Sequence, residues 1–304
     1  MAHFCHDDNG FAGKETGLVD QVRITATENV IGARIDGVDL RSPVKPATYD
    51  VLEEALERHG VLVIPAQEVS AGALVEFSRP FGNLKVAEPD DGGHPEHPEI
   101  LIVGNPPGML ISFSPRDPKG ELEWHVDYIH DRQPSRISIM HALATPAKGG
   151  DTLFACMFSA YDALSPAEQQ RYDTLRLRHS LAGLSRYIEN VGDATPEALG
   201  PSGENSVVWP LVRRHPRSGR KALYFGSHVS LGIEGQSDSE GEHFVRQLTE
   251  HATAPAFRYR HHWSVGDVVL WDNRRVLHAG TYYDVRLSHR LMHRTTIQEN
   301  HPIG

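Results

Sequence analysis

The sequence predicts an all-β core, a barrel or sandwich, with helices packed outside it. Many short segments rich in β-branched and aromatic residues are separated by turn signals, and few helical patterns interrupt them. Strand and helix patterns do not alternate, so a parallel βαβ architecture is not indicated. The 304 residues suffice for one large domain with a sizeable core, and no convincing boundary divides them.

The first half of the chain carries a polar start followed by short strands and two helices. Residues 1–19 predict a flexible tail, and residues 20–304 predict a single folded domain. At 46–59, apolar residues fall on one helical face and Gly60 follows as a stop signal. The expected elements are short strands at 20–42, a helix at 46–59, a buried strand at 61–65, a helix near 70–80, and strands at 100–105 and 137–143.

The second half is dominated by strands. Ser165, Pro166 and Glu168 form a helix-start pattern ahead of a helix at 165–175. The loop-like residues 183–206 are long enough to predict a functional lid. The expected strands after residue 207 contain VVWPLVRR, KALYFGS, FRYRHHW, DVVLW and LMHRTTI, interrupted by one helix near 240–252.

Composition and charge exclude several classes of protein. Apolar residues make up 39% and the formal net charge is -10, which suits a globular protein and disfavours nucleic-acid or anionic-membrane partners. No apolar run approaches the roughly 20 residues of a membrane helix, and the first residues do not resemble a signal peptide. The two cysteines form no CxxC motif, which favours a reducing, cytoplasmic location. A small molecule is the expected partner, and homo-oligomerisation is left open.

Three residues form a candidate metal site. In an extended segment, His125 and Asp127 would point to the same face, roughly 6.6–6.8 Å apart along the strand. The best third ligand is His278, which follows the apolar strand DVVLW and precedes a glycine turn. Two histidines and one carboxylate are typical of non-haem Fe(II) oxygenases, which keep the opposite coordination face open.

Other interpretations of these residues stay open at this point. Zinc hydrolases also use two histidines and a carboxylate, so the ligands alone do not identify the metal. Asp127 could instead cap a turn while His125 is hydrogen-bonded in the core of a non-catalytic barrel. The HxD pair alone favours this structural interpretation.

The sequence resembles the taurine dioxygenase/TfdA family of Fe(II)- and 2-oxoglutarate-dependent dioxygenases. The resemblance runs from about Val30 to Ile297, nearly the whole chain, and several blocks in the family's order are more specific than any one motif. The blocks are GVDLRSP (37–43), HGVLVIPAQ (59–67), FSRPFG (77–82), WHVD (124–127), GGDTLF (149–154) with the following SAYDALSP, HPRSGRKALYF (215–225), WSVGDVVLWDNRRVLH (263–278) and RLMHRTTI (290–297).

The resemblance implies a fold, a cofactor set and a reaction. The fold is a double-stranded β-helix (jelly roll) with supporting helices. His125, Asp127 and His278 would bind Fe(II), whereas Thr152 and Arg290 would bind the remote carboxylate of the cosubstrate 2-oxoglutarate. With O2 as second cosubstrate, a small organic acid or amino acid would be oxidised, most simply hydroxylated, with release of succinate and CO2. Desaturation, epoxidation or cyclisation in a biosynthetic pathway is the alternative within the family.

Three further residues are candidates for binding the primary substrate. Arg294 lies four residues after Arg290, so both can point inward from an extended segment, and a second buried cation would need an anion. The substrate could supply that anion, or Arg294 could form a structural ion pair within the protein. Tyr128 follows the HxD pair and offers aromatic surface. Glu121 stands where taurine-like members of the family carry an amide-bearing residue, so its carboxylate would repel the sulfonate of a taurine-like substrate. Glu121 could instead pair with Arg294 or contact an amino group of the substrate. Taurine itself is therefore disfavoured.

Overall fold

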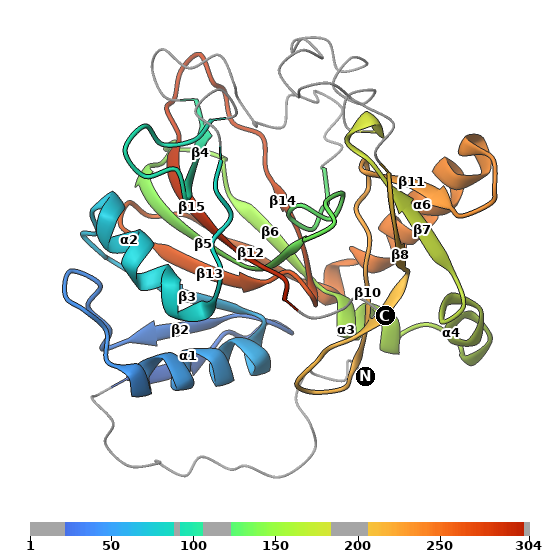
Figure 1. The fold of residues 1–304 in the computed structure, drawn as a ribbon, viewed down its shortest axis with the longest axis horizontal. Helices are drawn as coiled ribbons and strands as arrows, with labels where there is room; N and C mark the ends of the chain where they lie inside the picture. Colours follow the sequence, from blue (N-terminus) through green and yellow to red (C-terminus); the bar gives the residue numbers. More distant parts are fainter. Residues whose placement is uncertain (1–21, 88–91, 106–122, 184–205, 301–304) are drawn as a thin grey trace.

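The computed structural model describes residues 22–87, 92–105, 123–183 and 206–300 (Figure 1). The predicted tail at 1–19, almost all of the predicted lid at 183–206, and Glu121 lie outside these residues, so those three expectations stay predictions. Among the described residues, no helix combines the length and apolarity needed to cross a membrane.

The larger sheet has seven strands within the described residues. Neighbouring strands are antiparallel, except for one parallel pair between the second and third strands in the order. Across the sheet they follow as β1 (Arg23–Ala26), β2 (Ala33–Asp36), β3 (Val61–Ile64), β13 (Val268–Asp272), β5 (Ser135–Ala144), β15 (Leu291–Gln298) and β4 (Ile100–Gly104).

Three smaller sheets complete the β structure of the described residues. The one that concerns the site contains β12 (Arg258–His261), β6 (Thr152–Cys156) and β14 (Val276–Gly280), all antiparallel. The others are formed by β11 (Ser230–Ile233), β7 (Arg176–His179) and β8 (Val207–Pro210), and by β10 (Lys221–Leu223) and β9 (Val212–Arg214).

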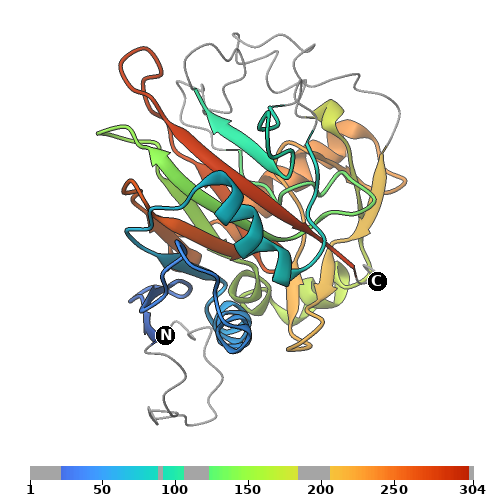
Figure 2. The same cartoon turned by 60° about the vertical axis from the view of Figure 1, so that its left-hand side comes forward.

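Helices cover the outside of this β core. Figure 1 shows α6 and α4, together with β7, β8 and β11, on the opposite side of the molecule from α2, and Figure 2 shows α2 lying across the sheet that contains β15. The helices are α1 (Pro46–His59), α2 (Ala71–Ser78), α3 (Met157–Asp162), α4 (Pro166–Tyr172) and α6 (Asp238–Ala252), with 3-10 turns at Arg79–Phe81 and Pro255–Phe257.

Local sequence explains where two of the helices begin and end. Pro46 occupies the first turn of α1, and Gly60 ends it with φ of 73°, a left-handed conformation in which the Gly60 N–H donates to the Leu56 carbonyl. At α4, Ser165 and Glu168 form the reciprocal capping box that the sequence predicts.

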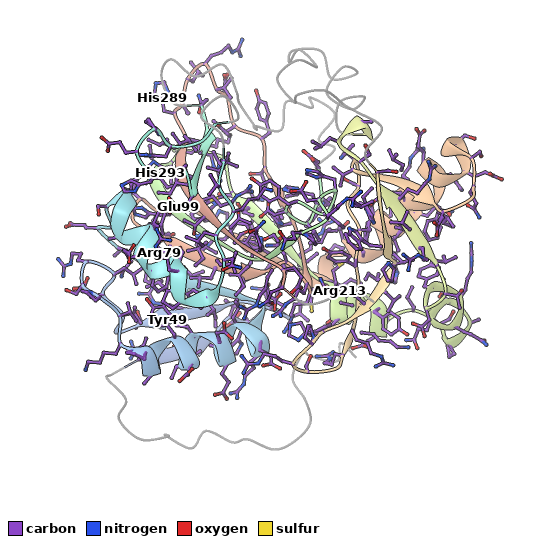
Figure 3. All side chains as sticks on the ribbon, in the orientation of Figure 1. Tyr49, Arg79, Glu99, Arg213, His289 and His293 are labelled. Carbon is purple, nitrogen blue, oxygen red and sulfur yellow. The ribbon has the colours of Figure 1, made fainter. Side chains whose placement is uncertain are left out.

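The larger sheet separates two hydrophobic cores, because alternate side chains of a strand point to opposite faces. Met140 and Met292 belong to the core between the sheets, whereas Ile139 and Ile297 belong to the core beneath α1 and α2. Side chains fill the space on both faces; on the helix side, the ring of Tyr49 lies 5.4 Å from that of Phe81 (Figure 3).

The structure confirms an all-β core with flanking helices. The predicted helix at 46–59 matches α1, and the predicted strands at 61–65, 100–105 and 137–143 correspond to β3, β4 and β5. Several elements were not predicted: the strands β6, β7, β11 and β14 and the helix α3. These are short buried or irregular segments in which neighbours, not local patterns, decide the conformation.

Candidate metal centre and cosubstrate site

Backbone pairing brings the two candidate histidines together. His125 and His278 form an isolated antiparallel bridge, in which the His125 N–H donates to the His278 carbonyl at 2.8 Å and the reverse bond measures 2.9 Å. Their ring centroids are 4.2 Å apart. The glycine turn expected directly after His278 is absent, because His278 lies inside β14, which continues through Gly280. A turn begins at Asp127, so the extended HxD segment expected from the sequence ends there.

The three candidate donors converge. His125 Nε2 lies 3.7 Å from one carboxylate oxygen of Asp127, and His278 Nε2 lies 3.7 Å from the other. One donor atom from each of the three residues lies within 4.8 Å of the other two. His125 Nδ1 lies 3.0 Å from the Glu123 carbonyl, which orients its Nε2 toward the centre.

Charge and burial give Asp127 and His278 the protonation states that a divalent metal requires. Burial alone would raise the pKa of Asp127, but the nearby Arg294 and the two imidazoles outweigh it and lower that pKa to about 2. Burial lowers the pKa of His278 to about 3. The site therefore offers an ionised carboxylate beside a neutral imidazole, a donor chemistry that fits a divalent transition metal.

A hydrogen-bond network missed by the sequence analysis holds the Asp127 carboxylate. Ser138 Oγ donates to Asp127 Oδ2 at 2.6 Å, and the amide of Asn273 donates to Ser138 and Ser135 at 2.9 and 2.8 Å. The Asn273 side-chain oxygen in turn accepts from the Asp127 N–H at 3.1 Å. Two features of the sequence could have indicated this network: the alternation of side chains along β5, which contains Ser138, and the position of Asn273 within the 263–278 block.

Arg294 lies at this centre and already has an anionic partner. Its Nη1 is 2.5 Å from Asp127 Oδ1, and both side chains are buried. The sequence predicted that a buried Arg294 would need an anionic partner. Asp127, which was not considered as that partner, supplies the negative charge from within the protein. Tyr128 lies beside this pair, with its ring centroid 5.5 Å from the Arg294 guanidinium carbon and 4.4 Å from Lys85 Nζ. The backbone of Tyr128 is left-handed, with φ of 53°.

Thr152 lies on the same face of its sheet as His278. In the β14–β6 register, His278 is opposite Phe154 and Gly280 is opposite Thr152. Residues two apart on a strand share a face, so the Thr152 side chain projects to the same side as that of His278, about 7 Å along the strand from its level.

Arg290 is a buried cation beside Thr152. Its Nε donates to the Gly150 carbonyl at 3.1 Å, and Gly150 is two residues before Thr152. Burial lowers the pKa of Arg290 to about 10. Among the residues that the structure describes, no carboxylate forms an ion pair with Arg290, which distinguishes it from Arg294.

Trp263 connects these two residues and was not singled out from the sequence. Its indole Nε1 donates to Thr152 Oγ1 at 3.0 Å, and the Arg290 guanidinium carbon lies 5.9 Å from its ring centroid. The structure thus combines an all-β core, a group of two histidines and one carboxylate that could hold a metal ion, and a buried cationic group in the same core.

Comparisons with known proteins agree with this description. The model of the family described as taurine catabolism dioxygenase TauD, TfdA family, matches residues 23–296. An alpha-ketoglutarate-dependent 2,4-dichlorophenoxyacetate dioxygenase from Burkholderia sp. (strain RASC) is 35% identical over 272 residues, 87% of this chain and 90% of the relative. Pentalenolactone F synthase from Streptomyces arenae is 31% identical over 84% of this chain and 88% of its own length.

Solved structures agree as well. The crystal structure of AAD-2 in complex with Mn(II) and N-oxalylglycine aligns with a TM-score of 0.76 and 30% identity, over 93% of this chain and 99% of that one. The chain belongs to the TauD/TfdA family. This confirms the family resemblance, the jelly-roll core and the enzyme class predicted from the sequence, a 2-oxoglutarate-dependent dioxygenase.

Proposed function

We propose that this enzyme uses Fe(II), 2-oxoglutarate and O2 to oxidise a small organic acid, with His125, Asp127 and His278 as the metal ligands and Arg290 and Thr152 as the cosubstrate site. The observation that carries the proposal is the pairing of two features in one β core. Three side chains that could hold a metal ion converge in the same β core as a buried arginine that has no ion-pair partner among the described residues.

In this proposal, one group of residues binds the metal and another binds the cosubstrate. The two imidazoles and Asp127 hold the metal, and Ser138 fixes the carboxylate oxygen opposite to the one that Arg294 contacts. Arg290 and Thr152 bind the remote carboxylate of 2-oxoglutarate, since a planar guanidinium matches a carboxylate and a hydroxyl adds a further hydrogen bond. Bound iron would supply the O2 chemistry, and the protein orients the reactants and excludes water.

An organic acid with an aromatic or other sizeable apolar body is the proposed substrate class. The Burkholderia relative is named for an aryloxy acid, 2,4-dichlorophenoxyacetate. In this chain, Tyr128 and Arg294 lie next to the metal ligands and would contact the body and the carboxylate of such a substrate, with Glu121 as a further candidate. Because Asp127 already pairs with Arg294, the substrate carboxylate would share the Arg294 guanidinium with Asp127 and would not neutralise an unpaired positive charge.

A second candidate reaction is favoured by one comparison. Pentalenolactone F synthase bears the name of a biosynthetic enzyme, so this chain could use the same cofactors for desaturation, epoxidation or cyclisation. Product mass separates these from hydroxylation. A zinc-dependent hydrolase would have no use for the Arg290–Thr152 pair and would work without O2, and a non-catalytic barrel would release no succinate.

The test is substrate-stimulated succinate release under air, screened over aryl acids, the matching amides and amino acids. We expect turnover that depends on Fe(II) and 2-oxoglutarate, and its loss in His125→Ala, Asp127→Ala and His278→Ala. His243→Ala, an exposed histidine on α6, is the matched control and should retain wild-type turnover. Wild-type turnover in all three ligand variants would refute the metal assignment.

A further inference from the structure

Trp263 contacts both proposed cosubstrate residues, Thr152 through its indole N–H and Arg290 through its ring face. The polar edge of its indole donates to the Thr152 hydroxyl at 3.0 Å, while its aromatic face lies 5.9 Å from the Arg290 guanidinium carbon. A cation within about 6 Å of an indole ring is attracted by the ring quadrupole. One side chain therefore contacts both groups that would bind the remote carboxylate.

The hydrogen bond to Thr152 determines which way the hydroxyl proton can point. A threonine hydroxyl has one donor hydrogen and two acceptor lone pairs, and an indole N–H can only donate. Trp263 therefore occupies a lone pair of Thr152 and leaves the hydroxyl hydrogen for another acceptor. Thr152 is buried, so a carboxylate oxygen arriving there would receive a donor that is already oriented.

Arg290 is restrained from two further directions. Its Nε donates to the Gly150 carbonyl at 3.1 Å, and its backbone N–H donates to Asn105 Oδ1 at 2.9 Å. With Nε engaged and the Trp263 ring nearby, the Nη donors remain for a ligand, since no hydrogen bond joins them to another residue that the structure describes. Trp263 is itself restrained by an edge-on contact with His261, whose ring centroid lies 4.7 Å away.

We infer that Trp263 is a positioning residue for 2-oxoglutarate, which orients the Thr152 hydroxyl and the Arg290 guanidinium toward the remote carboxylate. This inference rests on the proposed function of Thr152 and Arg290. It assigns Trp263 no contact with the metal or with the reacting end of the cosubstrate. Its loss should consequently affect recognition of the remote carboxylate and spare recognition of the keto acid end.

The experiment compares two keto acids by calorimetry on Mn(II)-loaded protein kept free of O2. The first is 2-oxoglutarate, and the second is 2-oxobutyrate, which lacks the remote carboxylate. Trp263→Phe keeps an aromatic ring and removes the N–H. We expect this variant to bind 2-oxoglutarate about five- to tenfold more weakly, the scale of one lost hydrogen bond, and to bind 2-oxobutyrate like the wild type.

A double-mutant cycle with Thr152→Val tests whether Trp263 acts through the hydroxyl. In the Thr152→Val background, Trp263→Phe should change 2-oxoglutarate affinity less than about twofold, because the bond it breaks is already absent. Equal weakening of both keto acids by Trp263→Phe would mean a general structural role and would overturn the inference. Wild-type 2-oxoglutarate affinity in Trp263→Phe would overturn it as well.

Failure of the underlying assignment gives a different result. If Thr152→Val and Arg290→Met both bind 2-oxoglutarate with wild-type affinity, the proposed cosubstrate site is wrong and the role of Trp263 falls with it. If those two variants lose affinity while Trp263→Phe does not, the cosubstrate site stands and only the inference about Trp263 is refuted.

Discussion

Two buried arginines on one segment should respond to the same substitution in opposite ways. Arg290 and Arg294 are 8% and 9% exposed, so their burial is matched, but only Arg294 forms an ion pair among the described residues. Replacement of either by methionine keeps length and apolar volume and removes the charge. In metal-free protein without cosubstrate, we expect Arg290→Met to retain or gain stability and Arg294→Met to lose it.

The magnitudes follow from the surroundings of each side chain. Burial lowers the pKa of Arg290 to about 10, and this decrease corresponds to ~3 kcal/mol of unfavourable charge burial near neutral pH. The folded protein regains this energy only as the pH rises through 10 and above, so the full penalty is present at pH 7. Arg290→Met removes the penalty but also the bond to the Gly150 carbonyl, worth ~1 kcal/mol. The free energy of unfolding should therefore rise by up to ~2 kcal/mol.

Arg294→Met has the opposite expectation. It leaves the buried Asp127 carboxylate without its guanidinium partner, and breaking a buried pair in this way costs about 3–5 kcal/mol. The measurement for both variants is urea denaturation at pH 7 in the presence of a chelator. A loss of several kcal/mol in Arg290→Met would refute the reasoning, because it would mean that Arg290 is already paired in the protein without cosubstrate.

The same variants give a ligand readout. A ligand that binds only the folded state at 100 times its Kd stabilises it by ~2.7 kcal/mol. Addition of 2-oxoglutarate to Mn(II)-loaded wild-type protein should produce a shift of this kind, and the shift should be absent in Arg290→Met at the same concentration. A variant more stable than the wild type without ligand, yet not stabilised by ligand, would show that Arg290 is kept for binding at a cost in stability.

Three further predictions concern other parts of the molecule. Ser138→Ala should weaken Mn(II) binding about 10- to 100-fold by releasing the Asp127 carboxylate, measured by calorimetry, whereas Ser135→Ala, whose hydroxyl does not contact that carboxylate, should have a smaller effect. Burial, with three neighbouring histidines, lowers the pKa of His293 to about 4 from an ordinary 6.5. As the pH drops from about 6.5 to 4, this histidine therefore binds a proton in the unfolded chain but not in the folded protein, and the free energy of unfolding should fall. His293→Phe should flatten this part of a pH–stability curve, and an unchanged slope would contradict the expectation. Ser165→Ala removes the capping box of α4 and should lower the free energy of unfolding by ~1 kcal/mol in thermal denaturation without altering turnover.

The sequence alone determined the elements and residues whose signals are local. The helix at 46–59 has its apolar face, its early proline and its terminal Gly60 within one short window, and the capping box at Ser165 spans four residues. His125 and Asp127 are two residues apart, so one motif nominated them as candidates, and the apolar strand before His278 suggested the third ligand. The resemblance to the family then favoured a metal site over a structural role for these residues. Such features depend on local backbone conformation and short spacing, which residues close together in the sequence specify by themselves.

Tertiary structure alone decided the partners of these residues. Asp127 meets Arg294 across 167 positions, and Trp263 meets Thr152 across 111. The strands β6 and β14 were missed for the same reason, because their residues are buried against partners distant in sequence and carry no alternation of polar and apolar positions. Contacts of this kind depend on strand register and on packing between sheets, which the local pattern of a single segment does not specify.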